Sequence, residues 1–175
     1  MSPLKTLFGV ATIGLSLISG LSANEHDYLL EARINERILV FYELNRKEKK
    51  ELQRFPIAVP VRVAYLPLPL TGEVKKIQIN PWWYPTAGTR TAYFKKNGEV
   101  LPAVIEPGNP KNAMGKAKIE FQFENLNLPI RIHGTNDPSS IGKRITRGCI
   151  RMQNEDILSL IKIIKDKKTQ VIFIM

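Results

Sequence analysis

Apolar and polar residues alternate strictly in KAKIEFQF, residues 116–123, and this period of two predicts a β-strand with one buried face. Other short segments are rich in branched and aromatic residues and also predict strands. These segments are RILVFYEL (37–44), EVKKIQIN (73–80), LPIRIHG (128–134) and TQVIFIM (169–175). A chain with this many short strands must bury their apolar faces against one another, which restricts it to a mainly β fold.

One segment near the C-terminus has helical spacing instead. Ile157, Leu160, Ile161 and Ile164 recur at intervals of three and four residues, and Asn154 is placed to cap the helix at its start. Many short strands and one clear helix predict a single mainly β domain, a sandwich or barrel. A chain of 175 residues is long enough to bury a core without a metal or a disulfide.

The remaining segments give weaker predictions. NRKEKKELQR (45–54) is a charged run and predicts an exposed hairpin loop or a short helix. Four prolines limit FPIAVPVRVAYLPLPLTG (55–72) to an edge strand that leads into an extended loop. PWWYPTAGT (81–89) predicts an aromatic turn, and VLPAVIEPGNPKNAMG (100–115) a short strand followed by a loop.

The N-terminus has the pattern of a secretory signal. Lys5 precedes an uncharged stretch that is apolar from Leu7 to Leu21, and Ala23 is a plausible cleavage point. We therefore expect a signal peptide over 1–23, a polar lead-in over 24–36 and one domain over 37–175. An uncleaved membrane anchor is the alternative. No later segment is apolar enough to span a membrane, so we expect a periplasmic or cell-wall-associated protein.

Export makes the single cysteine, Cys149, informative, because exported proteins tend to pair their thiols. Cys149 is either buried and inert, linked to another chain, or kept free for chemistry. A nucleophilic cysteine needs a base and positive charge near its sulfur. The segment between Pro138 and Met152 has no acidic residue and contains four cations: Lys143, Arg144, Arg147 and Arg151. Such charges lower a thiol pKa when they lie close to it.

His133 is the candidate base for this thiol. The other histidine, His26, falls near the start of the exported chain, whereas His133 ends a predicted strand. The loop between His133 and Cys149 has turn chemistry throughout, so it is able to return to its start. Gly148 permits close approach of the backbone to a substrate, and the N–H of Cys149 is a candidate oxyanion donor.

Interpretations of Cys149 and its neighbours without this chemistry remain open at this point. A lone cysteine is most often a small buried apolar residue, although the glycine before it disfavours deep burial here. No metal and no cofactor are expected, because one cysteine and one histidine lack ligand-pair spacing. Ser139 and Ser140 lie near His133, but their DPSS context is typical of a turn or a helix cap.

The segment HGTNDPSSIGKRITRGCIRM, residues 133–152, resembles the motif of the YkuD-type L,D-transpeptidase family of bacterial cell walls. The likeness is carried by His-Gly-Thr, Ser-Ile-Gly and Gly-Cys-Ile-Arg-Met. Weaker similarity extends upstream in PLTG (69–72), NPWWYP (80–85) and GNPKNAMG (108–115), and in all it covers about residues 37–175. Many members have a histidine before Gly-Cys, where this chain has Arg147.

The resemblance implies an L,D-transpeptidase-like β-sandwich or barrel and a role for each motif residue. Cys149 would be the nucleophile, His133 the base, and the Gly134 carbonyl the group that orients the imidazole, with Gly148 completing the catalytic set. It also implies substrate-binding roles for the remaining polar residues of the motif: Thr135, Arg147 and Arg151.

The implied reaction is acyl transfer on peptidoglycan. The sulfur would attack the third residue of a tetrapeptide stem, release D-alanine, and pass the acyl group to a second stem in a 3→3 cross-link. Water as acceptor would give an L,D-carboxypeptidase, and a protein lysine would give an enzyme that attaches envelope proteins.

Two further classes are less consistent with the sequence. A non-catalytic wall-binding protein would not need the intact motif. A nucleic-acid binder would use the formal charge of +10 and stacking by Trp82, Trp83 and Tyr84, but the export signal argues against nucleic acid as a partner. The sequence predicts no oligomeric state.

Overall fold

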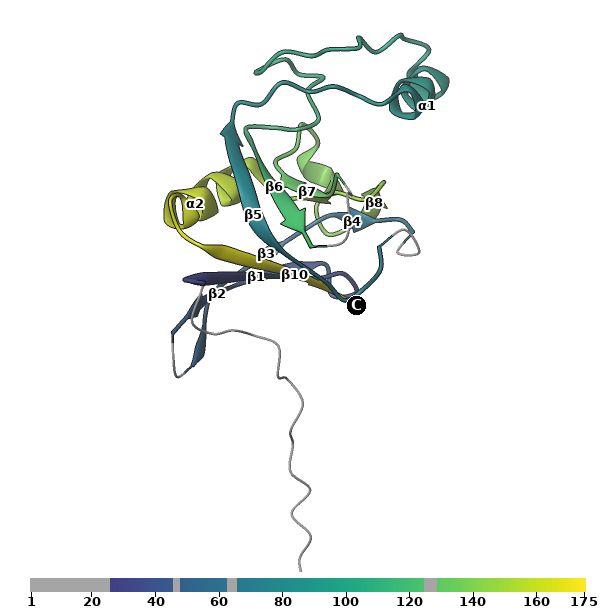
Figure 1. Ribbon diagram of the computed structural model, residues 1–175. Coiled ribbons are helices and arrows are strands. Elements are labelled where there is room, and N and C mark those ends of the chain that lie inside the picture. The colour runs from purple at the N-terminus through teal and green to yellow at the C-terminus, as the bar shows by residue number, and fades with distance from the viewer. Residues whose placement is uncertain (1–25, 46–47, 63–65, 125–128) are drawn as a thin grey trace, which may run out of the picture.

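In the computed structural model, an eight-stranded sheet curls into a half-barrel, with strand order β3-β2-β1-β10-β5-β6-β7-β9, beside a two-stranded β4-β8 ribbon (Figure 1). The structure describes residues 26–45, 48–62, 66–124 and 129–175. The expected signal peptide, 1–23, lies outside the described residues. The strands are β1 (Tyr28–Arg33), β2 (Ile38–Leu44), β3 (Lys49–Pro56), β4 (Val59–Pro60), β5 (Leu70–Ile79), β6 (Ala117–Phe123), β7 (Arg131–His133), β8 (Arg144–Thr146), β9 (Ile150–Arg151) and β10 (Thr169–Ile174). The helices are α1 (Ala87–Asn97), the 3₁₀ turn η2 (Pro138–Ser140) and α2 (Asn154–Ile164).

The mainly β prediction is confirmed, and the core fills the inner face of the curled sheet. Helix α2 packs against this face through the four apolar residues that its sequence spacing predicted, all at most 5% exposed. Phe121, Phe123 and Phe173 contact one another in the same core. Burial of these large side chains is the main stabilising contribution to the fold. Of the described helices, none combines the length and the apolar character needed to cross a membrane.

Two segments expected to be irregular are strands. The polar lead-in over 24–36 contains β1, which pairs with β2 and with β10 near the middle of the sheet, and Leu30 and Ala32 are fully buried there. The charged run over 45–54 contains β3, an edge strand paired with β2. The lead-in prediction was wrong, and the hairpin prediction holds for the turn between β2 and β3, where Asn45 N donates to Glu48 O at 3.1 Å, but not for residues 49–54. Backbone pairing with an apolar neighbour decided both segments. Charged side chains are also what an edge strand carries to avoid further pairing.

The structure has a second α-helix that the aromatic-turn prediction missed. Helix α1 has no buried residue, so it lacks the apolar periodicity that reveals a helix in sequence. Its ends are stabilised locally: Thr86 Oγ1 accepts a hydrogen bond from Thr89 N at 3.2 Å, and Gly98 ends the helix in the left-handed conformation.

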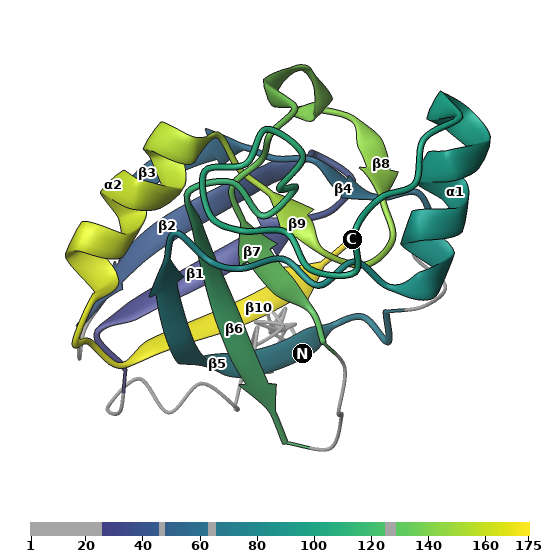
Figure 2. The same ribbon diagram turned by 90° about the horizontal axis from the view of Figure 1, so that it is seen from above.

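Helix α1 belongs to a long excursion from the sheet, residues 80–116, between β5 and β6. A backbone hydrogen bond from Asn80 N to Lys116 O, 2.8 Å, closes the base of this excursion. Figures 1 and 2 show α1 at the far side of the molecule from α2. The short strand expected within 100–115 is reduced to a single bridge between Trp83 and Ile105.

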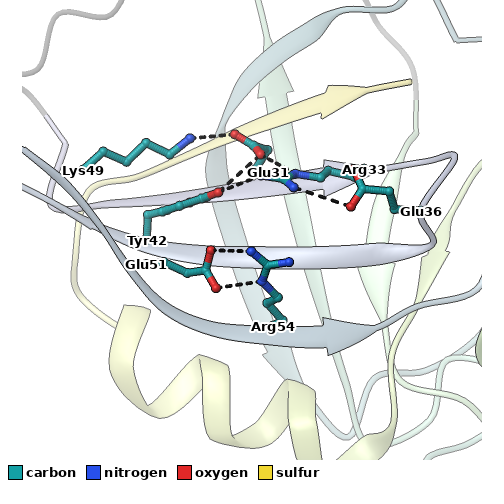
Figure 3. Close-up of polar contacts among 7 residues, drawn as sticks. All are labelled: Glu31, Arg33, Glu36, Tyr42, Lys49, Glu51 and Arg54. Carbon is teal, nitrogen blue, oxygen red and sulfur yellow. Dashed lines mark hydrogen bonds and ion pairs between the residues drawn. The ribbon is translucent and has the colours of Figure 1, made fainter.

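The outer face of β1, β2 and β3 carries a cluster of paired charges (Figure 3). Glu31 accepts hydrogen bonds from Lys49 Nζ at 2.6 Å and from Arg33 Nε at 2.7 Å. The Tyr42 hydroxyl donates to the same carboxylate at 3.4 Å, and the Lys49 ammonium lies 3.8 Å from the centre of the Tyr42 ring. Glu31 is only 8% exposed, so this buried carboxylate is neutralised by its neighbours.

Candidate active site

The register of β7 and β9 brings the candidate base and the candidate nucleophile to one face of the sheet edge. These strands pair in parallel, with Ile132 opposite Ile150 and His133 opposite Arg151. Ile132 and Ile150 are fully buried in the core. Because side chains alternate along a strand, His133 and Cys149 share the opposite face. At ~3.3 Å per residue and ~4.8 Å between strands, their Cα atoms are about 8 Å apart.

The loop before the cysteine is held by its own residues. Gly148 has φ of 135°, a backbone conformation that residues with a Cβ rarely adopt. The buried Thr146 hydroxyl donates to the Cys149 carbonyl at 2.5 Å. Upstream, β8 pairs with β4, and this pairing ties the loop to the rest of the fold. The thiol position therefore depends on a glycine conformation and one threonine.

The His133 ring has a defined tautomer. Its Nδ1 lies 2.7 Å from the Gly134 carbonyl oxygen, which accepts only, so Nδ1 carries the proton and Nε2 has the free lone pair. The strand backbone is fixed on both sides, because Met152 N donates to His133 O and Gly134 N donates to Ala117 O, each at 2.9 Å. The ring is buried and oriented, as a positioned base must be.

The pKa of His133 is lowered to about 4. Burial is the main cause, and the nearby charges of Arg151 and Arg131 act in the same direction. The hydrogen bond to the Gly134 carbonyl favours the protonated ring and offsets part of this shift. His133 is therefore neutral at pH 7.

The Cys149 thiol is half-buried and free, and its Sγ lies 3.9 Å from the Pro129 carbonyl oxygen. Burial raises the pKa of the thiol, and the cations Arg131 and Arg151 offset only part of that shift. The expectation that cations ionise this sulfur is therefore wrong for the resting protein, because desolvation outweighs them. In the described part of the chain, no hydrogen bond joins the thiol to the His133 ring.

Of the four cations expected around the thiol, Arg151 is among the main causes that lower its pKa. Arg151 is half-buried, and its Nη1 lies 3.5 Å from Ser140 Oγ. Arg144 instead bonds Asn35 at 2.7 Å, and Lys143 is exposed. Arg147 is exposed, and its Nη1 lies 3.6 Å from the position that a Cβ on Gly88 would take, so it contacts the start of α1.

Sequence reasoning missed Arg131. The register, continued by one residue, places it opposite Cys149, and both its backbone and its side chain lower the thiol pKa. Its Nη1 donates to the Pro129 carbonyl at 3.2 Å, the same oxygen that the thiol faces. The signal was present in Arg-Ile-His, because alternation puts Arg131 on the face of His133.

Asn154 does not cap α2 as expected. Its Oδ1 accepts from Lys116 N at 2.9 Å and from Thr135 N at 3.1 Å, while its Nδ2 donates to Thr135 O at 2.8 Å. A Cβ on Gly115 or on Gly134 would collide with this Oδ1. Asn154 therefore joins the base of the excursion to the loop that follows His133.

Thr135, for which the resemblance implied substrate binding, is turned into its own loop. It is 1% exposed, and its hydroxyl donates to Asp137 O at 3.2 Å and accepts from Asp137 N at 3.0 Å. The hydroxyl is thus used within its own loop. Its contribution is to shape the turn after His133.

Comparison with known proteins identifies the family of this chain and agrees with its fold. Residues 27–173 match the YkuD family, described as the L,D-transpeptidase catalytic domain, and the chain belongs to this family. The match begins before 37, which agrees with the place of β1 in the sheet.

Two curated relatives are named as probable L,D-transpeptidases. ErfK/SrfK of Salmonella typhimurium is 43% identical over 84 residues, which cover 48% of this chain and 25% of that protein. YbiS of Escherichia coli K12 is 36% identical over 105 residues, covering 58% and 32%. The chain thus spans about a quarter to a third of these relatives.

The solved structure of L,D-transpeptidase 3 from Mycobacterium tuberculosis superposes with a TM-score of 0.55 at 10% identity. The superposition covers 86% of this chain and 62% of that one. At this identity the likeness concerns the fold, and it agrees with the predicted L,D-transpeptidase-like architecture.

Proposed function

We propose that this protein is a cysteine-dependent L,D-transpeptidase of peptidoglycan. The observation that carries the proposal is the β7–β9 edge, where His133 and Cys149 share one face and the Gly134 carbonyl holds the imidazole with Nε2 as its free base. Family membership supports the same reaction class. A positioned histidine beside a thiol is the arrangement that activates a cysteine nucleophile.

The reaction begins with a tetrapeptide stem bound over this edge. The thiol proton passes to His133 Nε2, and the sulfur attacks the carbonyl carbon of the third stem residue. The tetrahedral intermediate collapses to a thioester, and D-alanine leaves with the proton returned by the imidazole. The amine of a second stem then attacks the thioester, forms the 3→3 amide and restores the thiol. We propose the Cys149 N–H as an oxyanion donor, with Gly148 allowing its turn.

The Cys149 thiol and the His133 imidazole are both neutral in the resting protein, and this determines when the first proton transfer takes place. A raised thiol pKa and a lowered imidazole pKa both oppose a standing thiolate–imidazolium pair. Proton transfer therefore accompanies the attack, when substrate has displaced water and the developing charge is stabilised by Arg131 and Arg151. Such a thiol is protected from unspecific oxidation between turnovers, because the thiolate is the reactive form.

The stem carboxylates supply the negative charge that this region lacks. Within the residues that the structure describes, Arg147 and Arg151 form no ion pair with an acid. The Asp137 carboxylate raises the pKa of Arg151, which burial lowers. The Oδ1 of Asp137, however, accepts a hydrogen bond from the Ser139 hydroxyl. We propose that Arg151 binds a carboxylate near the scissile bond and that Arg147 binds one further along the stem.

The decisive experiment is the mass of intact protein after exposure to a tetrapeptide donor or to a carbapenem. We expect one covalent adduct on wild-type protein, none on Cys149→Ala, and formation slowed at least about 100-fold in His133→Ala. Arg54→Ala, on the far outer face, is the matched control and should react like wild type. An adduct that persists in Cys149→Ala, or a folded wild-type protein that never reacts, would contradict the proposal.

The acceptor is identified by sorting the products by mass. A 3→3 dimer identifies transpeptidation, a tripeptide identifies water as acceptor, and a lysine adduct of an added envelope protein identifies attachment. We propose that the reaction takes place in the periplasm or cell wall after removal of residues 1–23. N-terminal sequencing of protein recovered from that compartment tests this cleavage.

A further inference from the structure

The excursion over residues 80–116 presents apolar surface that the reaction above does not use. Trp82 is 51% exposed, Tyr84 65% and Val104 47%, whereas large side chains of this kind are mostly buried in the sheet core. Exposed apolar side chains that gather in one place mark binding surfaces. Part of this surface is hollowed into a pocket beside Trp82.

The pocket has a volume of about 180 Å³ and a mixed lining. Trp82, Val104 and Ile105 supply an aromatic ring and aliphatic carbons, and Glu106, Asn109 and Lys111 supply charged and polar groups. Pockets for drug-sized ligands measure ~300–1,000 Å³, so this one takes a single ring with its substituents. A pyranose fits that description, because its C–H face is apolar and its hydroxyl and acetamido groups are polar.

The walls of the pocket are held in place by hydrogen bonds. Asn112 Nδ2 donates to Pro81 O at 2.9 Å and to Glu106 O at 3.0 Å, which ties the Trp82 side of the pocket to the Glu106 side. Trp83 and Ile105 exchange two backbone hydrogen bonds of 2.9 Å. Lys111 is paired with Glu99. The pocket is therefore formed before a ligand arrives, which lowers the entropic cost of binding.

The pocket is connected directly to the loop after His133. Asn136 Nδ2 donates to the carbonyl of Pro110 at 2.8 Å, and the two residues that flank Pro110, Asn109 and Lys111, line the pocket. The backbone of Ala113, two residues further on, favours the protonated form of His133 and so lies beside its ring. A ligand in the pocket thus sits against the segment that borders the proposed base.

From this arrangement we propose that the Trp82 pocket binds one N-acetylated sugar ring of the glycan strand that carries the donor stem. The inference rests on the proposed function and deepens it, because the substrate becomes a stem still attached to its glycan rather than a free peptide. The indole stacks on the C–H face of the ring, and the polar side of the pocket meets its hydroxyl and acetamido groups.

A protein partner fits the pocket less well. Stable protein interfaces bury about 800 Å² on each partner, whereas the pocket is a small hollow with charged groups on one side. The pocket also contacts the loop after His133, and this favours a ligand that is covalently attached to the stem peptide. A second copy of the chain would reveal itself as a concentration-dependent dimer that Trp82→Ala abolishes, and this result would overturn the proposal.

The first test is binding of a peptide-free tetramer of N-acetylglucosamine, measured by titration calorimetry. It does not require catalysis, so it is independent of the proposed function. We expect wild type and Tyr84→Ala to bind alike, because Tyr84 is exposed in the same turn but does not line the pocket. Trp82→Ala should bind roughly fivefold to tenfold more weakly and Trp82→Phe should recover part of the loss. No binding to wild type, or equal binding by all variants, would overturn the proposal.

The second test compares kcat/KM for a disaccharide-tetrapeptide with that for the free tetrapeptide. Wild type should prefer the glycan-bearing donor, and Trp82→Ala should lower this preference roughly fivefold to tenfold through KM, while Tyr84→Ala keeps it. An equal loss on both donors would mean that Trp82 only supports the fold and would overturn the inference. A wild type that binds the sugar but processes neither donor would instead contradict the proposed function alone.

Discussion

The two ends of the curled sheet handle buried charge in opposite ways. At the β1–β3 end, Glu31 is surrounded by Arg33, Lys49 and Tyr42, so its charge is matched inside the protein (Figure 3). At the β7–β9 end, in the described residues, Arg151 has a hydroxyl for a partner and no paired acid. One end is electrostatically complete, whereas at the other Arg131 pairs with Glu120 at 3.4 Å and Arg151 is left without an acid among the described residues.

The pKa shifts follow from this difference. Burial would raise the pKa of Glu31, but hydrogen bonds from Lys49 and Arg33 outweigh it and the pKa is lowered, so the carboxylate stays charged. Burial lowers the pKa of His133, and nearby cations lower it further, so this ring stays neutral. A charge that is paired inside the protein stabilises the fold, whereas a cation without an acidic partner, such as Arg151, is available to bind a charged ligand. We therefore assign the first end to stability and propose that the second binds the substrate.

Lowering the pH should remove the stability contributions of the two ends in different pH ranges. It gives the largest change that we expect. The unfolded chain binds a proton on His133 below pH 6.5 and the folded chain only below about 4, so stability falls as pH falls through this window. The loss amounts to about 3 kcal/mol. Urea unfolding at a series of pH values measures it, and His133→Asn should remove this slope.

Glu31 contributes in a lower window. Because its folded pKa is lowered, its stabilisation is complete above its ordinary pKa of 4.5 and is lost as pH falls below it. A wild-type protein equally stable at pH 6.5 and pH 4 would show that folding does not lower the pKa of His133.

Removing the unmatched cation should affect activity more than stability. Arg151→Gln removes the contact that we propose with the stem carboxylate, and we expect kcat/KM to fall roughly 30-fold, or about 2 kcal/mol. Steady-state kinetics with Arg144→Gln as the matched control checks this, because Arg144 bonds Asn35 away from the thiol. A large fall in Tm with unchanged kinetics would reverse the assignment of this end.

Removing the charge of Glu31 from its cluster with Arg33, Lys49 and Tyr42 should affect stability more than activity. Glu31→Gln removes the negative charge but keeps the shape, and we expect the free energy of unfolding to fall by about 1–2 kcal/mol. The rate of adduct formation at Cys149 should stay at the wild-type value in the folded protein. Thermal unfolding and adduct mass spectrometry on the same sample measure both. A slowed adduct would show that the two ends are coupled.

The smallest effect is expected at the rim of the same cluster. Arg54 pairs with Glu51 through hydrogen bonds of 2.7 and 2.9 Å, but both side chains are exposed, so water replaces the contact at little cost. Arg54→Ala should leave Tm and activity unchanged within error. A measurable drop in Tm would mean that the matched cluster extends further than Glu31 and its direct partners.

Sequence reasoning found the elements whose side chains have a distinctive local pattern. Strand β6 and helix α2 were predicted because their apolar residues recur at two or at three to four positions, and strands β2 and β10 because they are rich in branched and aromatic residues. It missed α1, which buries no residue, and it missed β1 and β3, where a polar sequence is paired by its neighbours. The local sequence pattern predicted an element correctly where burial of the element's own side chains determines its structure.

At the candidate site, the residues that carry chemistry were visible in the sequence and their partners were not. Cys149 and His133 were found because a thiol and a base are chemically distinctive, and the family resemblance added the Gly134 carbonyl. It gave no sign that Asn154 joins two loops, that Thr135 turns inward, or that Arg131 lies opposite the thiol. Those contacts join segments up to 38 positions apart.

The amino-acid sequence by itself determined the strands and the helix that have a distinctive apolar pattern, and which groups are chemically able to react, because both depend on side-chain chemistry and on local pattern. Only the tertiary structure decided their electrostatic state. Desolvation depends on everything packed around a group, and here it left the thiol and the imidazole neutral where the surrounding cations alone predicted an ionised sulfur.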